Sequence, residues 1–179
     1  MKYVITIGRQ YGSGGREVGK KLAEKLNIKY YDKELLAIAA KKSGLNESFI
    51  QSNDEKATNS LLYSIVMGYT NLNKHNNESL SIEELAYKAQ REGILSAAEK
   101  GSCVIVGRCA DYILRDSENV FSVFISAADE FRINRVAVRE NIDKDKAIIK
   151  NKKLTRKEKI IIIFRQTVFG ERLKIMIFV

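Results

Sequence analysis

The residues most able to do chemistry lie in a glycine-rich segment, residues 8–16, between an apolar run and a helical pattern. Glycine permits tight turns and close backbone approach, so several N–H groups can point into one concavity at the start of a helix. Such a concavity binds phosphate groups. A turn that binds nothing is the alternative interpretation. We predict that the phosphates of a nucleotide are held by Arg9, Gly12, Ser13, Gly14, Gly15 and Arg16.

This segment departs from the usual P-loop pattern, G-x-x-x-x-G-K-[ST], in which the lysine reaches the phosphates and the hydroxyl binds Mg²⁺. Counted back from Gly14, the first glycine position holds Arg9. The lysine position holds Gly15 and the hydroxyl position holds Arg16. Because a guanidinium binds phosphate oxygens in a bidentate fork, either Arg16 or Arg9 could supply the missing positive charge.

Two polar residues lie at or just past the ends of predicted strands. Asp32 directly follows residues 28–31, and Arg108 is separated from residues 103–106 by Gly107. Open α/β sheets bind their ligands at the carboxyl ends of the strands. A carboxylate there can accept hydrogen bonds from a sugar or a base, and an arginine can pair with a phosphate. We predict that both residues bind a nucleoside monophosphate. The alternatives are a helix cap for Asp32 and a surface ion pair for Arg108.

Three arginines, Arg132, Arg135 and Arg139, are spaced by three and four residues, so they share one face of a predicted helix. Beside a phosphate site, this face could neutralise the charge that develops during phosphoryl transfer. The alternative is an ordinary solvated helix face.

Short apolar runs alternate with helical patterns along the chain, which predicts a parallel α/β sheet flanked by helices. No linker or repeat interrupts the pattern, so we predict a single domain over residues 1–179. The predicted strands are residues 4–7, 28–31, 103–106 and 120–125. The predicted helices are residues 16–26, about 33–42, parts of 46–100, a short one ending near 114, 128–140, and a further short one from 143.

Composition excludes several classes of protein. Six of the nine net positive charges lie in residues 152–179, so no patterned basic face is expected and no specific nucleic-acid partner is predicted. No apolar run is long enough to cross a membrane, and we expect no membrane partner. The cysteines, Cys103 and Cys109, match neither a disulfide framework nor a metal site, which indicates reduced thiols in a cytoplasmic protein.

Four separated motifs, taken in order, closely resemble the cytidylate kinase-like family. They are IGRQYGSGGRE (7–17), YYDKEL (30–35), VGRCADYIL (106–114) and RINRV (132–136). The resemblance runs from Met1 to about Lys150. It implies a three-layer fold of the P-loop nucleoside monophosphate kinase type, with a helical insertion at about residues 46–100.

The resemblance also implies a function, which is ATP-dependent phosphoryl transfer to a nucleoside monophosphate, CMP being favoured, with Mg²⁺. Residues 12–16 would hold the ATP phosphates, and Asp32 and Arg108 would lie on the monophosphate side. The residues predicted to be catalytic are Arg16, Arg132 and Arg135. Because the P-loop lysine is missing, a non-catalytic nucleotide-binding or regulatory module on the same fold is the alternative function.

The tail, residues 152–179, departs from the family pattern, in which a lid segment, a Trp-Gly pair and a final strand are expected. A one-base shift in A/T-rich codons for residues 153–164 yields a lid-like segment. The same shift over residues 168–170 and 174–179 yields the other two. We hypothesise that the reading frame changes between Asn151 and Leu154. The alternative is a divergent basic tail that contacts an acidic partner or a membrane surface.

An out-of-frame tail would lack the lid arginine and the final strand. We therefore expect weak or absent turnover, and an open sheet edge beside Ile160–Ile163. The DNA across these codons tests the hypothesis. A one-base shift near Asn151 should restore the family ending, and a gene in which no such shift does so refutes the idea.

Overall fold

The computed structural model describes residues 2–32, 35, 82–169 and 175–178. The chain forms two compact units, residues 1–32 with 100–179, and residues 33–99. The described part of the second unit consists of Leu35 and nearly all of helix α4 (Ile82–Lys100). This helix lies in the insertion predicted over about residues 46–100. Most of the helix predicted at 33–42 falls outside the described residues.

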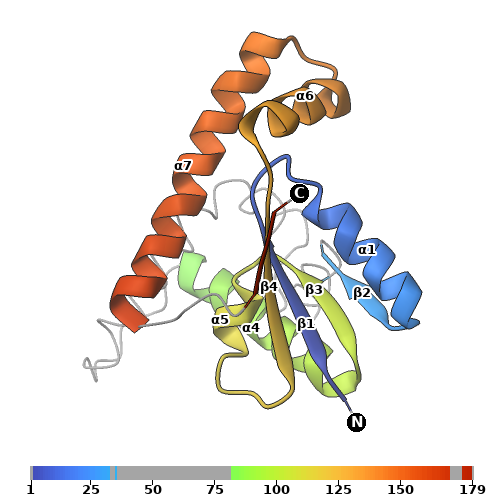
Figure 1. The fold of residues 1–179 in the computed structure, drawn as a ribbon. Helices are drawn as coiled ribbons and strands as arrows, with labels where there is room; N and C mark the ends of the chain where they lie inside the picture. The colour runs from blue at the N-terminus through green and yellow to red at the C-terminus, as the bar shows by residue number, and fades with distance from the viewer. Residues whose placement is uncertain (1, 33–34, 36–81, 170–174, 179) are drawn as a thin grey trace. The chain divides into compact units, whose positions relative to one another are not determined.

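The first unit is built on a five-stranded sheet whose paired strands all run parallel, in the order β2-β3-β1-β4-β5 (Figure 1). Parallel strands need crossover connections, which are usually helices. The predicted α/β class is therefore confirmed. The strands are β1 (Val4–Arg9), β2 (Lys29–Tyr31), β3 (Cys103–Val106), β4 (Val120–Ser126) and β5 (Ile175–Phe178). The helices are α1 (Gly15–Leu26), α5 (Ala110–Ile113), α6 (Asp129–Glu140) and α7 (Lys144–Phe169).

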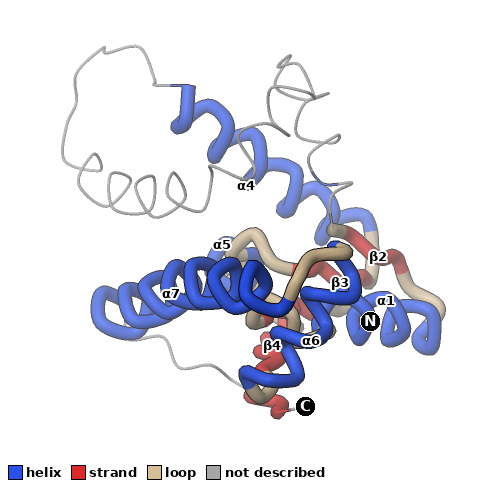
Figure 2. The backbone as a smooth tube through the Cα atoms, turned by 90° about the horizontal axis from the view of Figure 1, so that it is seen from above, coloured by secondary structure: helices blue, strands red, loops and turns tan. Residues whose placement is uncertain are grey.

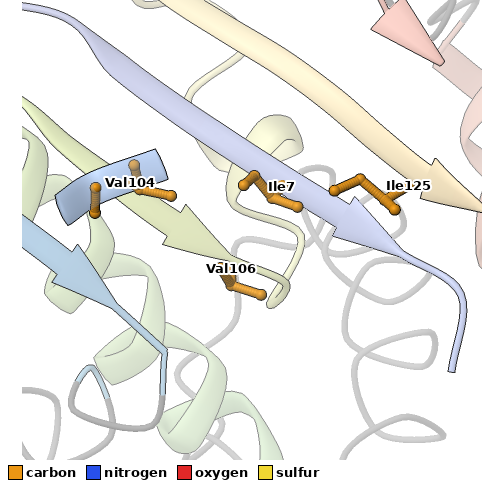
Figure 3. Packing of buried hydrophobic residues seen from close by; sticks show 5 residues of the cluster. Ile7, Val104, Val106 and Ile125 are labelled. Atoms are coloured by element: carbon orange, nitrogen blue, oxygen red, sulfur yellow. The ribbon is translucent and has the colours of Figure 1, made fainter. Parts of the chain in front are cut away.

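The core of this unit lies between the sheet and α1. All four residues of β3 are buried, as expected for a strand covered on both faces. A Cβ atom at Gly19 of α1 would lie 2.8 Å from a methyl group of Val106, so the helix packs closely on the sheet. The buried cluster consists of Ile7, Ala23, Val104, Val106 and Ile125 (Figure 3).

Beyond the carboxyl ends of β1 and β4, helices α6 and α7 pack against each other (Figure 2). The start of α7 agrees with the helix predicted from Asp143, whose carboxylate accepts a 2.8 Å hydrogen bond from the Lys146 N–H. The predicted length is wrong, because α7 continues for 26 residues. None of the helices in the described part of the chain is long and apolar enough to cross a membrane.

The expectation that the tail leaves the sheet without a final strand is also wrong. Strand β5 pairs in parallel with β4, with Val123 opposite Ile175 and Ser126 opposite Phe178. The segment Ile175–Phe178 is apolar, and such residues favour strands. The tail therefore contributes one helix and one edge strand to the unit.

The core predicts that alanine substitutions at two isoleucines lower the free energy of unfolding by clearly different amounts. Replacing Ile7, which is 1% exposed, by alanine should lower the free energy of unfolding by about 3 kcal/mol, because it removes buried methyl groups and leaves a cavity. The matched control is Ile149→Ala on α7, where the side chain is 67% exposed and the change should be about 0.5 kcal/mol or less. Urea unfolding followed by circular dichroism measures both, and equal losses would contradict this account of the core.

Candidate functional site

The glycine-rich segment forms the connection between the central strand β1 and helix α1. Gly12 and Gly14 have φ angles of 82° and 84°, a left-handed conformation that costs other residues energy. The Ser13 N–H donates to the Gln10 carbonyl at 3.0 Å and closes the turn. Because the first N–H groups of a helix lack intrahelical acceptors, the loop ends at donors directed out of α1.

Helix α6 covers one side of this loop. A Cβ atom at Gly12 would lie 2.7 Å from the Arg132 carbonyl oxygen, so only glycine permits this approach. The Ser13 side chain is 1% exposed, and its hydroxyl has no hydrogen-bond partner among the described residues. A buried hydroxyl without a partner is costly, and an oxygen-rich ligand in the loop would satisfy it. Donors of this kind fit a phosphate group.

Arg135 of α6 lies over the loop. The Cβ position at Gly14 is 3.5 Å from the Nε, Cζ and Nη2 atoms of Arg135. The same guanidinium forms an ion pair with Glu17 in the first turn of α1. It also lies 5.9 Å from the centre of the Phe131 ring. The loop therefore combines helix N–H groups with a positioned cation.

Asp32, Arg16 and Arg108 come together at the carboxyl ends of β2 and β3. Arg16 Nε lies 2.5 Å from an Asp32 carboxylate oxygen, and Arg108 Nε donates to the Asp32 carbonyl at 3.1 Å. The two residues predicted for the monophosphate side are thus in contact. Arg16 was predicted to hold ATP phosphates, and here its guanidinium pairs with this carboxylate. The Asp32 residue is buried, whereas the Arg16 side chain is 52% exposed.

Arg9 lies between the glycine-rich loop and the residues that follow β3. It is the last residue of β1, and its stem packs on Gly15 at the start of α1. Its Nη1 atom lies against Gly107, which directly follows β3.

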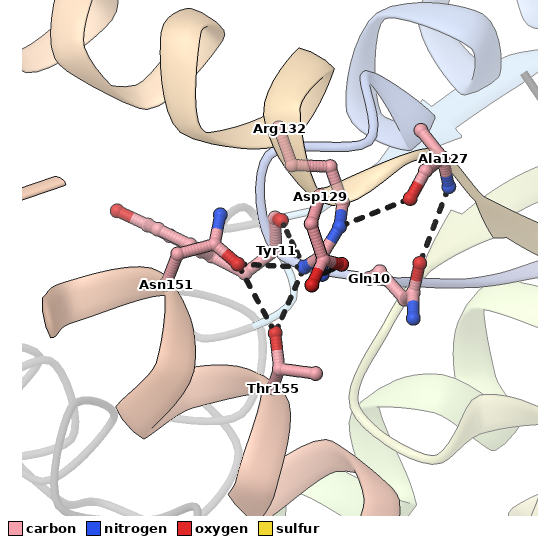
Figure 4. A network of polar contacts seen from close by, with 7 residues as sticks. All are labelled: Gln10, Tyr11, Ala127, Asp129, Arg132, Asn151 and Thr155. Atoms are coloured by element: carbon pink, nitrogen blue, oxygen red, sulfur yellow. Dashed lines mark hydrogen bonds and ion pairs between the residues drawn. The ribbon is translucent and has the colours of Figure 1, made fainter. Parts of the chain in front are cut away.

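Arg132 is the largest fully buried side chain among the described residues (Figure 4). Its Nε donates to the Ala127 carbonyl at 3.1 Å, and its Nη2 pairs with Asp129. Its Nη1 donates to the Tyr11 carbonyl at 3.2 Å, and to the Asn151 and Thr155 side chains at 2.8 Å each. The predicted catalytic contact of Arg132 stays a prediction. Its structural contacts are a role that sequence reasoning missed.

Arg139 completes the arginine face of α6. Its guanidinium lies 5.0 Å from the centre of the Tyr11 ring and donates to Glu140 at 2.9 Å. Arg132, Arg135 and Arg139 therefore all contact the glycine-rich loop or lie beside it. The spacing correctly predicts a shared face, and this face meets the loop. The solvated-face alternative is wrong for the buried Arg132, whereas the Arg139 side chain is 46% exposed.

Glu140, the last residue of α6, links the loop to α7. It accepts hydrogen bonds from the Tyr11 hydroxyl and from Lys150, the latter at 2.6 Å. Burial alone would raise the pKa of Glu140, but hydrogen bonds from Lys150, Tyr11 and Arg139 lower it to about 2. Burial and the bond to Glu140 raise the pKa of Tyr11. Glu140 is therefore an anion and Tyr11 is neutral near pH 7.

Known proteins can now be compared with this arrangement. The model of the cytidylate kinase-like family matches residues 4–172. The chain belongs to the cytidylate kinase-like family. The match extends beyond Lys150 and includes most of the tail, whose frameshift stays a hypothesis. No curated protein matches the chain in sequence.

Solved structures agree with this family assignment at the level of the fold. An uncharacterized protein from Eubacterium ventriosum has a TM-score of 0.64 and 30% identity, over 99% of this chain and 88% of that one. Shikimate kinase from Bacteroides thetaiotaomicron has a TM-score of 0.53 and 14% identity, over 98% and 85%. Shikimate kinase from Aquifex aeolicus has a TM-score of 0.51 and 17% identity, over 97% and 85%. The fold is thus that of small P-loop kinases.

Because the Arg132 guanidinium is buried, we predict that its removal greatly lowers the free energy of unfolding. Arg132→Met should lower the free energy of unfolding by about 3 kcal/mol, because it leaves several acceptors without their charged donor. The control Arg115→Met removes an arginine that is 42% exposed and pairs with Asp116, so it should cost about 1 kcal/mol at most. Urea unfolding measures both. A loss at Arg132 no larger than at Arg115 would contradict the structural role.

Proposed function

We propose that this protein transfers a phosphoryl group from ATP to a nucleoside monophosphate, with CMP as the favoured acceptor. The observation that carries the proposal is the Arg135 guanidinium beside Gly14, at the N-terminus of the helix that follows the central strand. Helix N–H groups and a fixed cation together form a site for an anion. Membership of the cytidylate kinase-like family supports a nucleotide phosphate as this anion.

The ATP phosphates would occupy the loop over Gly12–Arg16, with Arg9 on its other side. The Ser13 hydroxyl would donate a hydrogen bond to a phosphate oxygen, which would give this buried group a partner. No group of three or more His, Cys, Asp or Glu side chains in the described part of the chain could hold a metal ion. We propose that Mg²⁺ binds together with the nucleotide, held chiefly by phosphate oxygens and water. Its chemistry is to neutralise charge on the transferred group.

The acceptor would bind at Asp32 and Arg108. Arg108 has a φ angle of 56° and is followed by Cys109 at 50°, a pair of left-handed residues that are not glycine. Such strain occurs preferentially at ligand-binding sites. Arg108 would pair with the acceptor phosphate and Asp32 with its sugar or base. The preference for CMP rests on the family resemblance alone.

Two arginines are proposed to be catalytic, and Arg132, which the sequence also predicted to be catalytic, is proposed to be a positioning residue. Arg135 and Arg16 would neutralise the charge that develops on the transferred phosphoryl group. For this role, the Arg16 guanidinium must leave its ion pair with Asp32 and bind a phosphate oxygen instead. Arg132 is proposed to act through position, because it holds the loop at Tyr11 against α6.

Nucleotide binding without transfer is the second candidate function. It is favoured by the lysine position, which holds Gly15, and by the ion pair that occupies Arg16. We also propose a cytoplasmic location, which the two free cysteines support. Burial raises the pKa of Cys103 to about 11, so this thiol stays protonated and unreactive.

The proposal predicts that MgATP raises the melting temperature of the full chain, and that CMP produces more ADP than AMP or UMP does. Arg135→Gln should weaken ATP binding at least tenfold, because a charge-assisted contact contributes about 1.5–3 kcal/mol. The control Lys20→Gln alters an exposed cation on α1 that pairs with Glu24, and should leave binding unchanged.

A thermal-shift titration and a coupled ADP assay separate the outcomes. Stabilisation by ATP without ADP production supports the binding-only function. Absence of any ATP effect, or equal binding by the Arg135 and Lys20 variants, contradicts the proposed site.

A further inference from the structure

We infer that Arg9 takes the place of the missing P-loop lysine, and that the cation and the glycine of the usual loop have exchanged positions in this chain. This inference rests on the proposed nucleotide site and assigns the phosphate-binding cation within it. In the usual pattern, the first position is glycine and the seventh is lysine. Here the first is Arg9 and the seventh is Gly15.

Side chains at positions 9 and 15 would occupy the same space. A Cβ atom at position 15 would lie 2.6 Å from the Cβ of Arg9 and 3.2 Å from its Cγ. Contacts under about 3 Å between such atoms are not tolerated in packed proteins, so one of the two residues must be glycine. The Arg9 stem fills the space in which a lysine stem at position 15 would begin.

The direction of the Arg9 side chain follows from strand geometry. Ile7 packs in the cluster beneath α1, and side chains two residues apart on a strand share a face. Arg9 therefore extends from the face of β1 that α1 covers, at the point where α1 begins. It lies opposite Ile125 of β4 in the sheet register.

The guanidinium ends where a phosphate-bridging cation is needed. A Cβ atom at Gly107 would lie 2.4 Å from Arg9 Nη1, and Gly107 has a φ angle of 76°. The next residue, Arg108, donates to Asp32 on the proposed acceptor side. The Arg9 side chain thus extends from the proposed ATP loop toward the proposed acceptor site. The lysine of the usual P-loop likewise carries a positive charge to the β- and γ-phosphates.

Arg16 is the competing candidate, and its position is less suitable. Its guanidinium pairs with Asp32, and its side chain is 52% exposed. A lysine equivalent must be held between the phosphates by its surroundings. The stem of Arg9 is held by Gly15, which directs its guanidinium across the end of the sheet.

A swap of the two residues tests the inference in the full chain. The variants are Arg9→Gly, Gly15→Lys and the double variant Arg9→Gly/Gly15→Lys, with Lys20→Gln as the control. Binding of MgATP and of inorganic tripolyphosphate is measured by calorimetry, and folding by urea unfolding. Arg9→Gly should fold and lose at least tenfold in affinity for both ligands. Gly15→Lys alone should be destabilised, because its stem meets Arg9.

The double variant gives the decisive result. It restores the glycine and the lysine of the usual loop pattern, while the hydroxyl position still holds Arg16. Its stability and its affinity for both ligands should therefore return to within a few-fold of the unmodified chain. Unchanged affinity in Arg9→Gly overturns the inference, as does a double variant that binds no better than Arg9→Gly. An unmodified chain that binds both ligands but does not phosphorylate CMP overturns the transfer function only. One that binds neither ligand overturns both.

Discussion

The buried guanidinium of Arg132 holds its own helix, α6, together with three other segments of the unit. It bonds to the glycine-rich loop at Tyr11, to the end of β4 at Ala127, and to α7 at Asn151 and Thr155. A buried cation is tolerated only where its N–H groups find acceptors, so these segments must keep their relative positions. The glycine-rich segment can therefore be rigid although four of its residues are glycine.

Because α6 is fixed in this way, its remaining arginines are placed by helix geometry. Arg135, one turn further along, reaches Gly14, and Arg139 reaches the ring of Tyr11. The carboxyl end of the sheet thus gathers cations from different elements around one loop. Backbone donors and guanidinium groups act together here, and this combination gives an otherwise small site affinity for multiply charged ligands.

Local signals in the sequence predicted most of the sheet unit. Strand β3 was predicted with its observed bounds, because four apolar residues are bounded by residues that favour turns. The bounds of α6 were predicted within one residue, since its periodicity is clear. The length of α7 was not, because residues 144–159 are largely polar and show no strong helical period. Strand β5 was missed because residues 174–179 were interpreted as part of an out-of-frame tail, although Ile175–Phe178 is apolar and pairs with β4.

The sequence alone determined the family, the parallel α/β class and the group of residues from which the site is built. Its spacing also placed three arginines on one face of α6. Only the tertiary structure decided what each arginine does. Arg132 lies inside the protein, Arg16 pairs with Asp32, and Arg9 packs on Gly15. The physical reason is that a guanidinium on a long stem can reach several partners. Which partner it meets depends on burial and on contacts between segments far apart in the chain, and local sequence does not encode these.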